Sequence, residues 1–387
     1  MAKDSRWWVC YAIGAFALVA LLGTAVVLVG TQFLGWSLGL DQASRHVKVH
    51  TPVGTDYFSV QFSLSHESSG AYIIPMQIGK TNPTTVAMLL DTGSADTWID
   101  SFTGFPTSSE SFTSYPDERY RIQYIGGTVT GNAGHDQLSI NTFSWSQKFG
   151  VVSSESMQTV DMDGILGVSL GGCDQRQMCS LTNWPLNQSV LGFYYDPSNW
   201  AGLFMAGFVN ETEYCAPGTR LTWLNLTASY YWMGKVGMKF NGQAVGSNLV
   251  AVFDTGTTYF MMSQTLFNKV NAILRTDGCS SPTLTLVISG VSFTIPTTVL
   301  LISNAGGSCR LRTGIVGSNG VSQDILVGAA FLVNFYSVFD LGTPRLGFCP
   351  AKVGLTGDSR RLREDNGISR LLDVPSRING NTRQTKP

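Results

Sequence analysis

Two segments of the 387-residue chain carry the triplet Asp-Thr-Gly at the end of an apolar run. Asp91 follows residues 86–90, and Asp254 follows residues 249–253. Each run is typical of a buried strand that ends in a turn, so each turn would carry a carboxylate. Because a buried carboxylate is unfavourable unless it is paired or hydrogen-bonded, we expect the two aspartates to lie together and share one proton.

Two carboxyl groups that share a proton can hydrolyse an amide bond without a metal ion or a covalent intermediate. One of them accepts a proton from water while the other donates a proton to the carbonyl oxygen. Gly93 and Gly256 permit a close approach of the two turns. Ser94 and Thr257 place hydroxyl groups beside the carboxylates. The pattern therefore predicts a hydrolase with the two aspartates as its catalytic residues.

The two halves of the chain repeat a second signature at a similar distance. A pair of apolar residues followed by glycine ends at Gly167, 76 residues after Asp91, and another ends at Gly328, 74 residues after Asp254. Two motifs with matching spacing rarely arise by chance. A chain of this length suits two lobes of about 150 residues each, so we expect a duplicated, two-lobed architecture.

The elements that must position these residues read mainly as strands. Apolar positions alternate in residues 284–288 and 291–295, on either side of Ser289-Gly290, which predicts a hairpin. One helix is predicted from a Ser263 cap to Leu274, with apolar residues at helical spacing. Helical patterns are otherwise scarce, so we expect an all-β fold with a few short helices.

Together these motifs resemble the pepsin-like aspartic protease family over roughly residues 56–350. The sequences D-T-G-S at 91–94 and D-T-G-T at 254–257 match the two catalytic loops of that family, and residues 163–167 and 331–340 match further segments. The resemblance implies a bilobal β fold, peptide or protein substrates, no cofactor, no metal ion and a monomer. It implies an aspartic endopeptidase, and because a pair that shares one proton needs acidic surroundings, we expect it to act at acidic pH, in the secretory or endolysosomal pathway.

The resemblance also implies supporting roles around the pair. Residues 122–131 resemble the flap hairpin that closes over substrate, with Ile125 in place of one of the usual glycines. The flap residues implied to contact substrate are Tyr124, Gly126, Gly127 and Thr128. The residues implied to support the active site are Thr92, Gly93, Ser94, Trp98, Thr255, Gly256 and Thr257. Of these, the two Asp-Thr-Gly threonines match the residues that lock the two loops together.

The chain departs from the family pattern in several places. Two small cysteine loops that are common in the family are absent, and Ala329 stands where an Asp often follows the glycine of the second signature. Residues 41–57 are short for a prosegment, which argues against activation by prosegment removal. Six cysteines beyond the N-terminal segment allow 15 pairings. The resemblance implies the pair Cys279–Cys309. Closeness in the sequence favours Cys173–Cys179, and the cysteines that remain give Cys215–Cys349.

An apolar run of 23 residues, from Trp7 to Val29, predicts a helix that crosses a membrane. At about 1.5 Å per residue, such a helix spans a hydrocarbon core about 30 Å thick. The apolar stretch of a cleaved signal peptide is shorter, about 7 to 15 residues, so we expect an uncleaved signal anchor, with secretion after cleavage as the alternative. The even set of cysteines indicates a lumenal or extracellular location for the rest of the chain. N-glycosylation acceptors indicate the same location, and they are Asn187, Asn210 and Asn225.

We expect five segments along the chain. They are a cytosolic stub and anchor at 1–40, a short stem or residual prosegment at 41–55, an N-terminal β lobe at 56–214, a C-terminal β lobe at 215–350, and a disordered basic tail at 351–387. The tail has eight Lys and Arg against four Asp and Glu and few apolar residues. The formal net charge of the whole chain is −1, which offers no basic surface for nucleic acid, so we expect no such partner.

The sequence also bears on three other interpretations. Residues 167–171 match G-x-S-x-G, but a serine hydrolase of that fold needs a histidine after the serine, and all four histidines precede it. A zinc hydrolase is disfavoured because the sequence has no H-E-x-x-H motif and no cluster with zinc-ligand spacing. The remaining alternative is a catalytically silent relative that binds peptides or proteins, although both Asp-Thr-Gly motifs are intact.

Overall fold

The computed structural model describes residues 56–64, 71–101, 109–156, 162–171, 178–196, 201–278, 282–296, 301–303, 309–311, 313–316 and 323–353. All of these described residues belong to one compact unit. Strands predominate among the described residues and helices are few and mostly short, which confirms the fold class expected from the apolar patterns.

Thirteen of the described strands form one sheet, which takes strands from both halves of the chain. The N-terminal half contributes β1 (Phe58–Leu64), β2 (Tyr72–Ile78), β3 (Thr84–Asp91), β4 (Thr97–Asp100), β5 (Thr113–Tyr124), β6 (Gly127–Ile140), β7 (Phe143–Glu155), β8 (Gly164–Gly167), β9 (Val190–Asp196) and β10 (Ala201–Ala206). The C-terminal half contributes β11 (Thr222–Asn225), β20 (Phe335–Asp340) and β21 (Arg345–Pro350). Their order is β11-β21-β20-β9-β10-β1-β2-β3-β8-β4-β7-β6-β5, with an additional pairing between β2 and β6.

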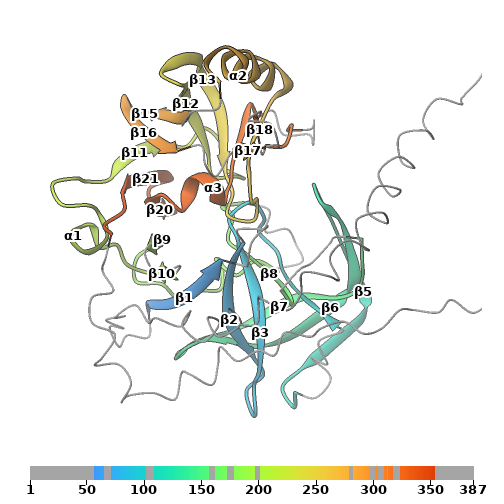
Figure 1. Ribbon diagram of the computed structural model, residues 1–387. Coiled ribbons are helices and arrows are strands. Elements are labelled where there is room, and N and C mark those ends of the chain that lie inside the picture. Colours follow the sequence, from blue (N-terminus) through green and yellow to red (C-terminus); the bar gives the residue numbers. More distant parts are fainter. Residues whose placement is uncertain are drawn as a thin grey trace, which may run out of the picture. The chain divides into compact units, whose positions relative to one another are not determined.

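A second sheet of six described strands belongs wholly to the C-terminal half. Its strands are β12 (Met233–Phe240), β13 (Gln243–Phe253), β14 (Phe260–Met262), β15 (Thr283–Ile288), β16 (Val291–Pro296) and β19 (Ile325–Val327), in the order β14-β19-β13-β12-β15-β16. The remaining described elements are the strand pair β17 (Leu301–Ser303) and β18 (Cys309–Leu311), and the helices α1 (Glu211–Tyr214), α2 (Gln264–Asp277) and α3 (Ala329–Leu332). Figure 1 shows α2 beside β12 and β13 at one end of this half.

The local predictions for this half are confirmed. Strands β15 and β16 form a hairpin whose turn is Ser289-Gly290, and both turn residues have positive φ (49° and 83°). Such a turn matches the right-handed twist of the two strands. Helix α2 begins after Ser263 and buries Leu266 and Val270 on one face, as the spacing of its apolar residues predicts.

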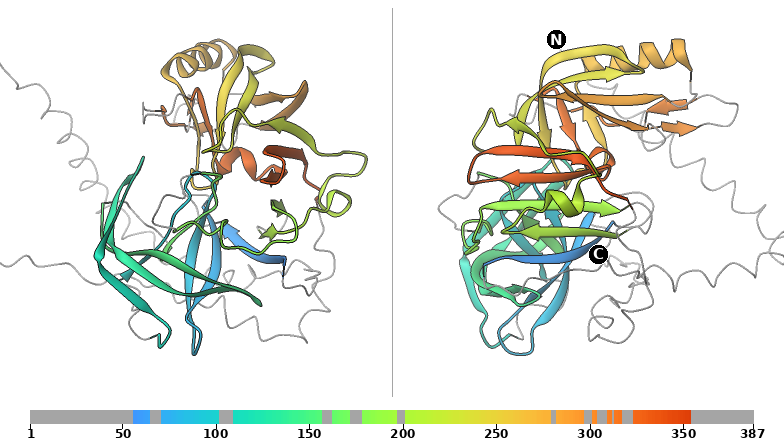
Figure 2. Two further views of the ribbon diagram at one scale, coloured as in Figure 1. Left: turned by 180° about the vertical axis from the view of Figure 1, so that it is seen from behind. Right: turned by 90° about the vertical axis from the view of Figure 1, so that its left-hand side faces the viewer.

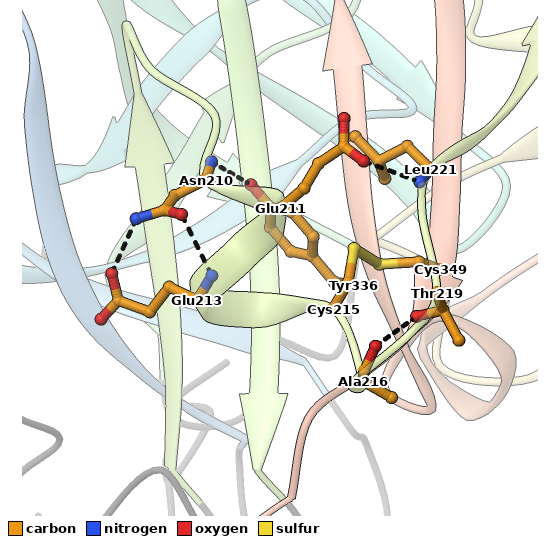
Figure 3. Close-up of a disulfide and its surroundings, with 9 residues drawn as sticks. All are labelled: Asn210, Glu211, Glu213, Cys215, Ala216, Thr219, Leu221, Tyr336 and Cys349. Carbon is orange, nitrogen blue, oxygen red and sulfur yellow. Dashed lines mark hydrogen bonds between the residues drawn. A yellow bond between two sulfur atoms is a disulfide. The ribbon is translucent and has the colours of Figure 1, made fainter.

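The two halves are joined through the large sheet rather than by a linker alone. Strand β20 pairs antiparallel with β9, and Figure 2 shows the red strands beside the green ones. A disulfide between Cys215 and Cys349 fastens the C-terminal end of α1 to β21, which confirms that predicted pair (Figure 3). The large sheet therefore crosses the lobe boundary expected between residues 214 and 215.

Each half contains the same unit of three strands. In the first unit, β8 lies between β3, to which it is parallel, and β4, to which it is antiparallel. In the second unit, β19 lies between β13 and β14 with the same two directions. The registers correspond, because Met88 is opposite Gly164 and Ala251 is opposite Ile325. The repeated signatures of the sequence thus become repeated strand arrangements.

Several predicted features lie outside the described residues. They are the anchor helix at 7–29, the stem at 41–55, the tail beyond Val353, and the cysteines at 173 and 279. Within the described part of the chain, no helix is both long enough and apolar enough to cross a membrane.

Candidate active site

The two Asp-Thr-Gly loops occupy equivalent places in the two three-strand units. Asp91 is the last residue of β3 and lies opposite Gly167 of β8. Asp254 directly follows β13, and its backbone N–H donates to the carbonyl oxygen of Val327 in β19 (3.0 Å). Each aspartate therefore stands where the chain leaves a parallel strand pair.

Thr92 and Thr255 bind the two loops to each other. The N–H of Thr92 donates to Oγ1 of Thr255 (3.0 Å), and the N–H of Thr255 donates to Oγ1 of Thr92 (2.9 Å). Each hydroxyl also donates to a carbonyl oxygen of the other half: Thr92 to Phe253 (3.0 Å) and Thr255 to Leu90 (2.6 Å). Because both threonines are buried, these four hydrogen bonds are shielded from water and fix the distance between the loops.

Each aspartate receives the same pair of hydrogen bonds from its own loop. In the first loop the N–H of Gly93 donates to Asp91 Oδ1 (2.8 Å), and the hydroxyl of Ser94 donates to Oδ2. In the second loop the N–H of Gly256 donates to Asp254 Oδ1 (2.8 Å). The Thr257 hydroxyl donates to Asp254 Oδ2 (2.6 Å). These donors orient both carboxyl groups in one geometry.

The two carboxyl groups face each other at close range. A Cβ atom on Gly93 would lie 2.5 Å from the carboxyl carbon of Asp254, and a Cβ on Gly256 would press against the carboxyl group of Asp91. Glycine is therefore required at both positions, as the sequence predicts. The loops approach each other through their bare backbones, which leaves no side chain between the two acids.

The protonation of Asp91 is shifted by this setting. Burial raises the pKa of Asp91 well above its ordinary value, and the charge of Asp254 together with a hydrogen bond between the two carboxyl groups raises it further. Hydrogen bonds from Ser94 and Gly93 favour the ionised form and oppose this rise in pKa. The pair therefore keeps a proton at a pH where an isolated carboxyl group would have lost it.

The predicted flap is a hairpin of β5 and β6 with Ile125 and Gly126 at its tip. Tyr124, the last residue of β5, accepts a hydrogen bond from Nε1 of Trp98 (2.9 Å). Burial raises the pKa of Tyr124, and the nearby charge of Asp91 raises it further, so the phenol lies close to the carboxyl pair. The structure thus places the flap tyrosine near Asp91, and its role over a substrate stays a prediction. Ile125 is 59% exposed at the flap tip.

A sequence model described as eukaryotic aspartyl protease matches residues 71–351. This chain belongs to that family. Gastricsin of Callithrix jacchus is 29% identical over 336 residues, which cover 76% of this chain and 84% of that protein. Gastricsin of Homo sapiens is 28% identical over 337 residues, with the same two coverages. Pregnancy-associated glycoprotein 1 of Ovis aries is 24% identical over 315 residues, which cover 72% of this chain and 81% of that protein.

One departure from the family pattern lies beside the second Asp-Thr-Gly loop. Ala329 is the first residue of α3 and is buried, and its N–H donates to the carbonyl oxygen of Thr257 (2.8 Å). The methyl group of Ala329 can offer no hydrogen bond to the loop.

One residue beside the site is not singled out by the sequence patterns. Oδ2 of Asp324 accepts a hydrogen bond from the N–H of Val250 (2.9 Å), just as Oδ2 of Asp163 accepts one from the N–H of Ala87 (2.8 Å). The sequence signal for Asp324 is the repeat itself, because both aspartates lie four residues before the final glycine of their repeat signature.

The remaining predicted sites lie away from the carboxyl pair. The glycosylation acceptors Asn187 and Asn225 are exposed, whereas Asn210 caps α1, with its Oδ1 accepting from the N–H of Glu213 (3.0 Å) (Figure 3). The pairings Cys173–Cys179 and Cys279–Cys309 stay predictions. Within the part of the chain that the structure describes, no group of three or more His, Cys, Asp and Glu side chains could hold a metal ion.

Proposed function

We propose that this protein is an aspartic endopeptidase that cleaves peptide or protein substrates with a water molecule activated between Asp91 and Asp254. The observation that carries the proposal is the opposition of two hydrogen-bonded carboxyl groups from the two halves, with the pKa of Asp91 raised by burial and by Asp254. Family membership supports the same reaction class. A pair that retains one proton has both an acid and a base available at once.

The reaction follows from that protonation state. The ionised carboxylate takes a proton from water while the water oxygen bonds to the carbonyl carbon of the scissile amide, and the protonated carboxyl donates its proton to the carbonyl oxygen. The resulting diol then collapses: a hydroxyl proton returns to the carboxylate, the C–N bond breaks, and the amine nitrogen takes a proton from the pair. The products are a carboxylic acid and an amine, and the pair is restored with one proton.

The residues around the pair would orient it and exclude water. Four hydrogen-bond donors hold the two carboxyl groups in place, and they are the N–H groups of Gly93 and Gly256 and the hydroxyl groups of Ser94 and Thr257. Because these donors are already oriented, they need to move little when charge moves during the reaction. The flap carrying Tyr124 would close over a bound peptide and shield the reacting atoms from bulk water. In this proposal Gly126, Gly127 and Thr128 bind the peptide backbone through their own backbone groups.

We further propose that the protease acts in the secretory or endolysosomal pathway, anchored by residues 7–29 with its catalytic part in the lumen. The support is the apolar run, the three acceptor asparagines and the Cys215–Cys349 disulfide, which forms in oxidising compartments. Alkaline carbonate extraction of membranes tests the anchor. Full-length protein released into the supernatant would show that it does not span the bilayer.

The experiment for activity is cleavage of a peptide library by the purified full-length protein from acidic to neutral pH, with and without pepstatin. We expect pepstatin-sensitive cleavage that is lost in Asp91→Asn and in Asp254→Asn, because each carboxyl group has a role that the other cannot fill. Both variants should keep the wild-type fold by circular dichroism. A folded wild-type protein that binds the library without cleaving it would instead be the silent peptide-binding relative.

A further inference from the structure

Each half of the protein contains an aspartate, outside the carboxyl pair, that is bonded twice to the strand leading to the pair. Oδ2 of Asp163 accepts from the N–H of Ala87 (2.8 Å), and the N–H of Asp163 donates to the carbonyl oxygen of Ala87 (2.7 Å). Asp324 makes the same two bonds to Val250, at 2.9 and 2.8 Å. We call these two contacts, Asp163–Ala87 and Asp324–Val250, the register clasps.

The register clasps extend the hydrogen bonding of the two parallel strand pairs, β3–β8 and β13–β19. Strand β8 begins at Gly164 and β19 begins at Ile325, each directly after the clasping aspartate. The side-chain carboxylate therefore supplies a hydrogen-bond acceptor at the point where the strand begins. Without it, the partly buried N–H of Ala87 or Val250 would lose its partner, which is unfavourable for a backbone donor away from water.

Each clasping aspartate also joins the third strand of its unit. The N–H of Asp100, at the end of β4, donates to the carbonyl oxygen of Asp163 (2.7 Å). The N–H of Ser263, just after β14, donates to the carbonyl oxygen of Asp324 (2.8 Å). Both aspartates thus lie where three strands meet, and in both halves the clasped residue stands four positions before the aspartate of the pair.

This placement bears on the reaction because the carboxyl pair depends on strand register. A slip of one residue along β3 would move Asp91 by about 3.3 Å and turn its side chain to the other face of the sheet. A misplacement of about 1 Å is enough to reduce a rate about 100-fold. The pair is formed by both halves, so the position of each strand affects the distance between the two acids.

We propose that Asp163 and Asp324 are positioning residues, which hold the strands carrying Asp91 and Asp254 in the register that brings the two carboxyl groups together. This inference rests on the proposed protease function for its kinetic consequence. The matching contacts in the two halves are its main support, because they place the same constraint on both members of the pair.

The test compares two kinds of substitution at each position in the full-length protein. Leucine in Asp163→Leu or Asp324→Leu has a similar size but no acceptor, whereas asparagine in Asp163→Asn or Asp324→Asn keeps an acceptor oxygen. Asp340→Leu is the control: this buried aspartate accepts from the N–H of Thr343 and from Nε of Arg345, both at 2.9 Å, at the end of β20. The Asp340→Leu variant measures the effect of losing a buried carboxylate that lies outside both three-strand units.

We expect the leucine variants to lose about 10- to 100-fold in kcat with little change in KM, and the asparagine variants to recover most of that loss. The pH profile of kcat/KM should also narrow in the leucine variants. Two carboxyl groups that lie close together share a proton, which lowers the first apparent pKa of the pair and raises the second. When the carboxyl groups move apart, the two apparent pKa values approach each other, and so do the acidic and basic limbs of the pH profile. Asp340→Leu should lower stability while leaving both limbs in place.

Amide hydrogen exchange gives a measure that does not depend on activity. Exchange should quicken in residues 84–91 for Asp163→Leu and in residues 249–254 for Asp324→Leu, each in its own half. Unchanged exchange there, limbs that stay in place, or asparagine variants as impaired as the leucine ones would overturn the inference. If the wild-type protein hydrolyses no peptide, the proposed function fails, and the exchange data alone decide whether the register clasps hold the strands.

Discussion

The indole Nε1 of Trp98 donates a hydrogen bond of 2.9 Å to the phenol oxygen of Tyr124, and this bond joins the flap to the strand that follows the first Asp-Thr-Gly loop. Strands β4 and β5 are not neighbours, because β7 and β6 lie between them in the sheet. The contact therefore fixes the end of the flap relative to Asp91 through side chains alone. Trp98 is fully buried, so it offers a rigid donor.

Tyr124→Phe should lower kcat/KM by roughly 10-fold, because the flap loses the bond that holds its end near the carboxyl pair. Trp98→Phe should cause a similar loss, and the double variant should be little worse than either single one, since both remove the same bond. Steady-state kinetics on one peptide substrate measures this. Tyr115→Phe, at the other end of β5, is the matched control; equal losses in both tyrosine variants would contradict a specific role for Tyr124.

The stability of the protein should fall as pH rises through the titration of Asp91. Its pKa is raised in the folded state, so the folded protein binds a proton more tightly than the unfolded chain does, and this contribution is complete below the unfolded pKa of about 3.9. It is lost as pH rises from that value through the raised folded pKa. Urea unfolding at a series of pH values should show that the free energy of unfolding depends less on pH in Asp91→Asn than in the wild type. If the two proteins show the same dependence on pH, the pKa of Asp91 is not raised in the folded state.

The hydrogen bonds between the loops of Thr92 and Thr255 should contribute to stability as a coupled unit. Thr92→Val removes the hydroxyl that accepts from the N–H of Thr255 and donates to Phe253, and it leaves two buried backbone groups without a partner. We expect a loss of about 2 kcal/mol in the free energy of unfolding for Thr92→Val or Thr255→Val. The double variant should lose less than the sum of the two, as measured by urea unfolding. Strict additivity would show that the two hydroxyl groups act independently.

The elements that could be predicted from the sequence are those whose signals are local. The aspartate loops, the hairpin of β15 and β16 and helix α2 each follow from a short pattern of apolar residues and turn residues. The flap is predicted only through the resemblance to a family pattern, and in the structure Trp98 donates a hydrogen bond to its tyrosine, Tyr124.

The features that escaped prediction depend on contacts between distant segments. The pairing of β9 with β20, which carries the large sheet across both halves, has no local signal, because either strand could pair with any strand of similar apolar pattern. The contact of Asp324 with Val250 also depends on a parallel strand pair that is formed only in the folded chain. Taken alone, Asp324 looks like an ordinary turn residue before an apolar run, and only its match to Asp163 in the repeat distinguishes it.

Ala329→Asp should shift the acidic limb of the activity profile to lower pH. A buried carboxyl group tends to stay protonated, and an Asp at this position would lie beside Thr257, to whose carbonyl the N–H of residue 329 is bonded. Such a group can donate to Oγ1 of Thr257, which leaves the hydroxyl hydrogen directed at Oδ2 of Asp254. A well-oriented donor favours the ionised form of the pair and lowers its first apparent pKa.

The measurement is kcat/KM against pH for the wild type, for Ala329→Asp and for Ala330→Asp, which places the same side chain one residue further along α3. If orientation of the Thr257 hydroxyl sets the limb, only the substitution at 329 moves it downward. If the new carboxylate ionises, its negative charge opposes ionisation of the pair and the limb rises instead. A limb that rises or stays in place in Ala329→Asp would show that this alanine does not set the pH range of the proposed peptide cleavage.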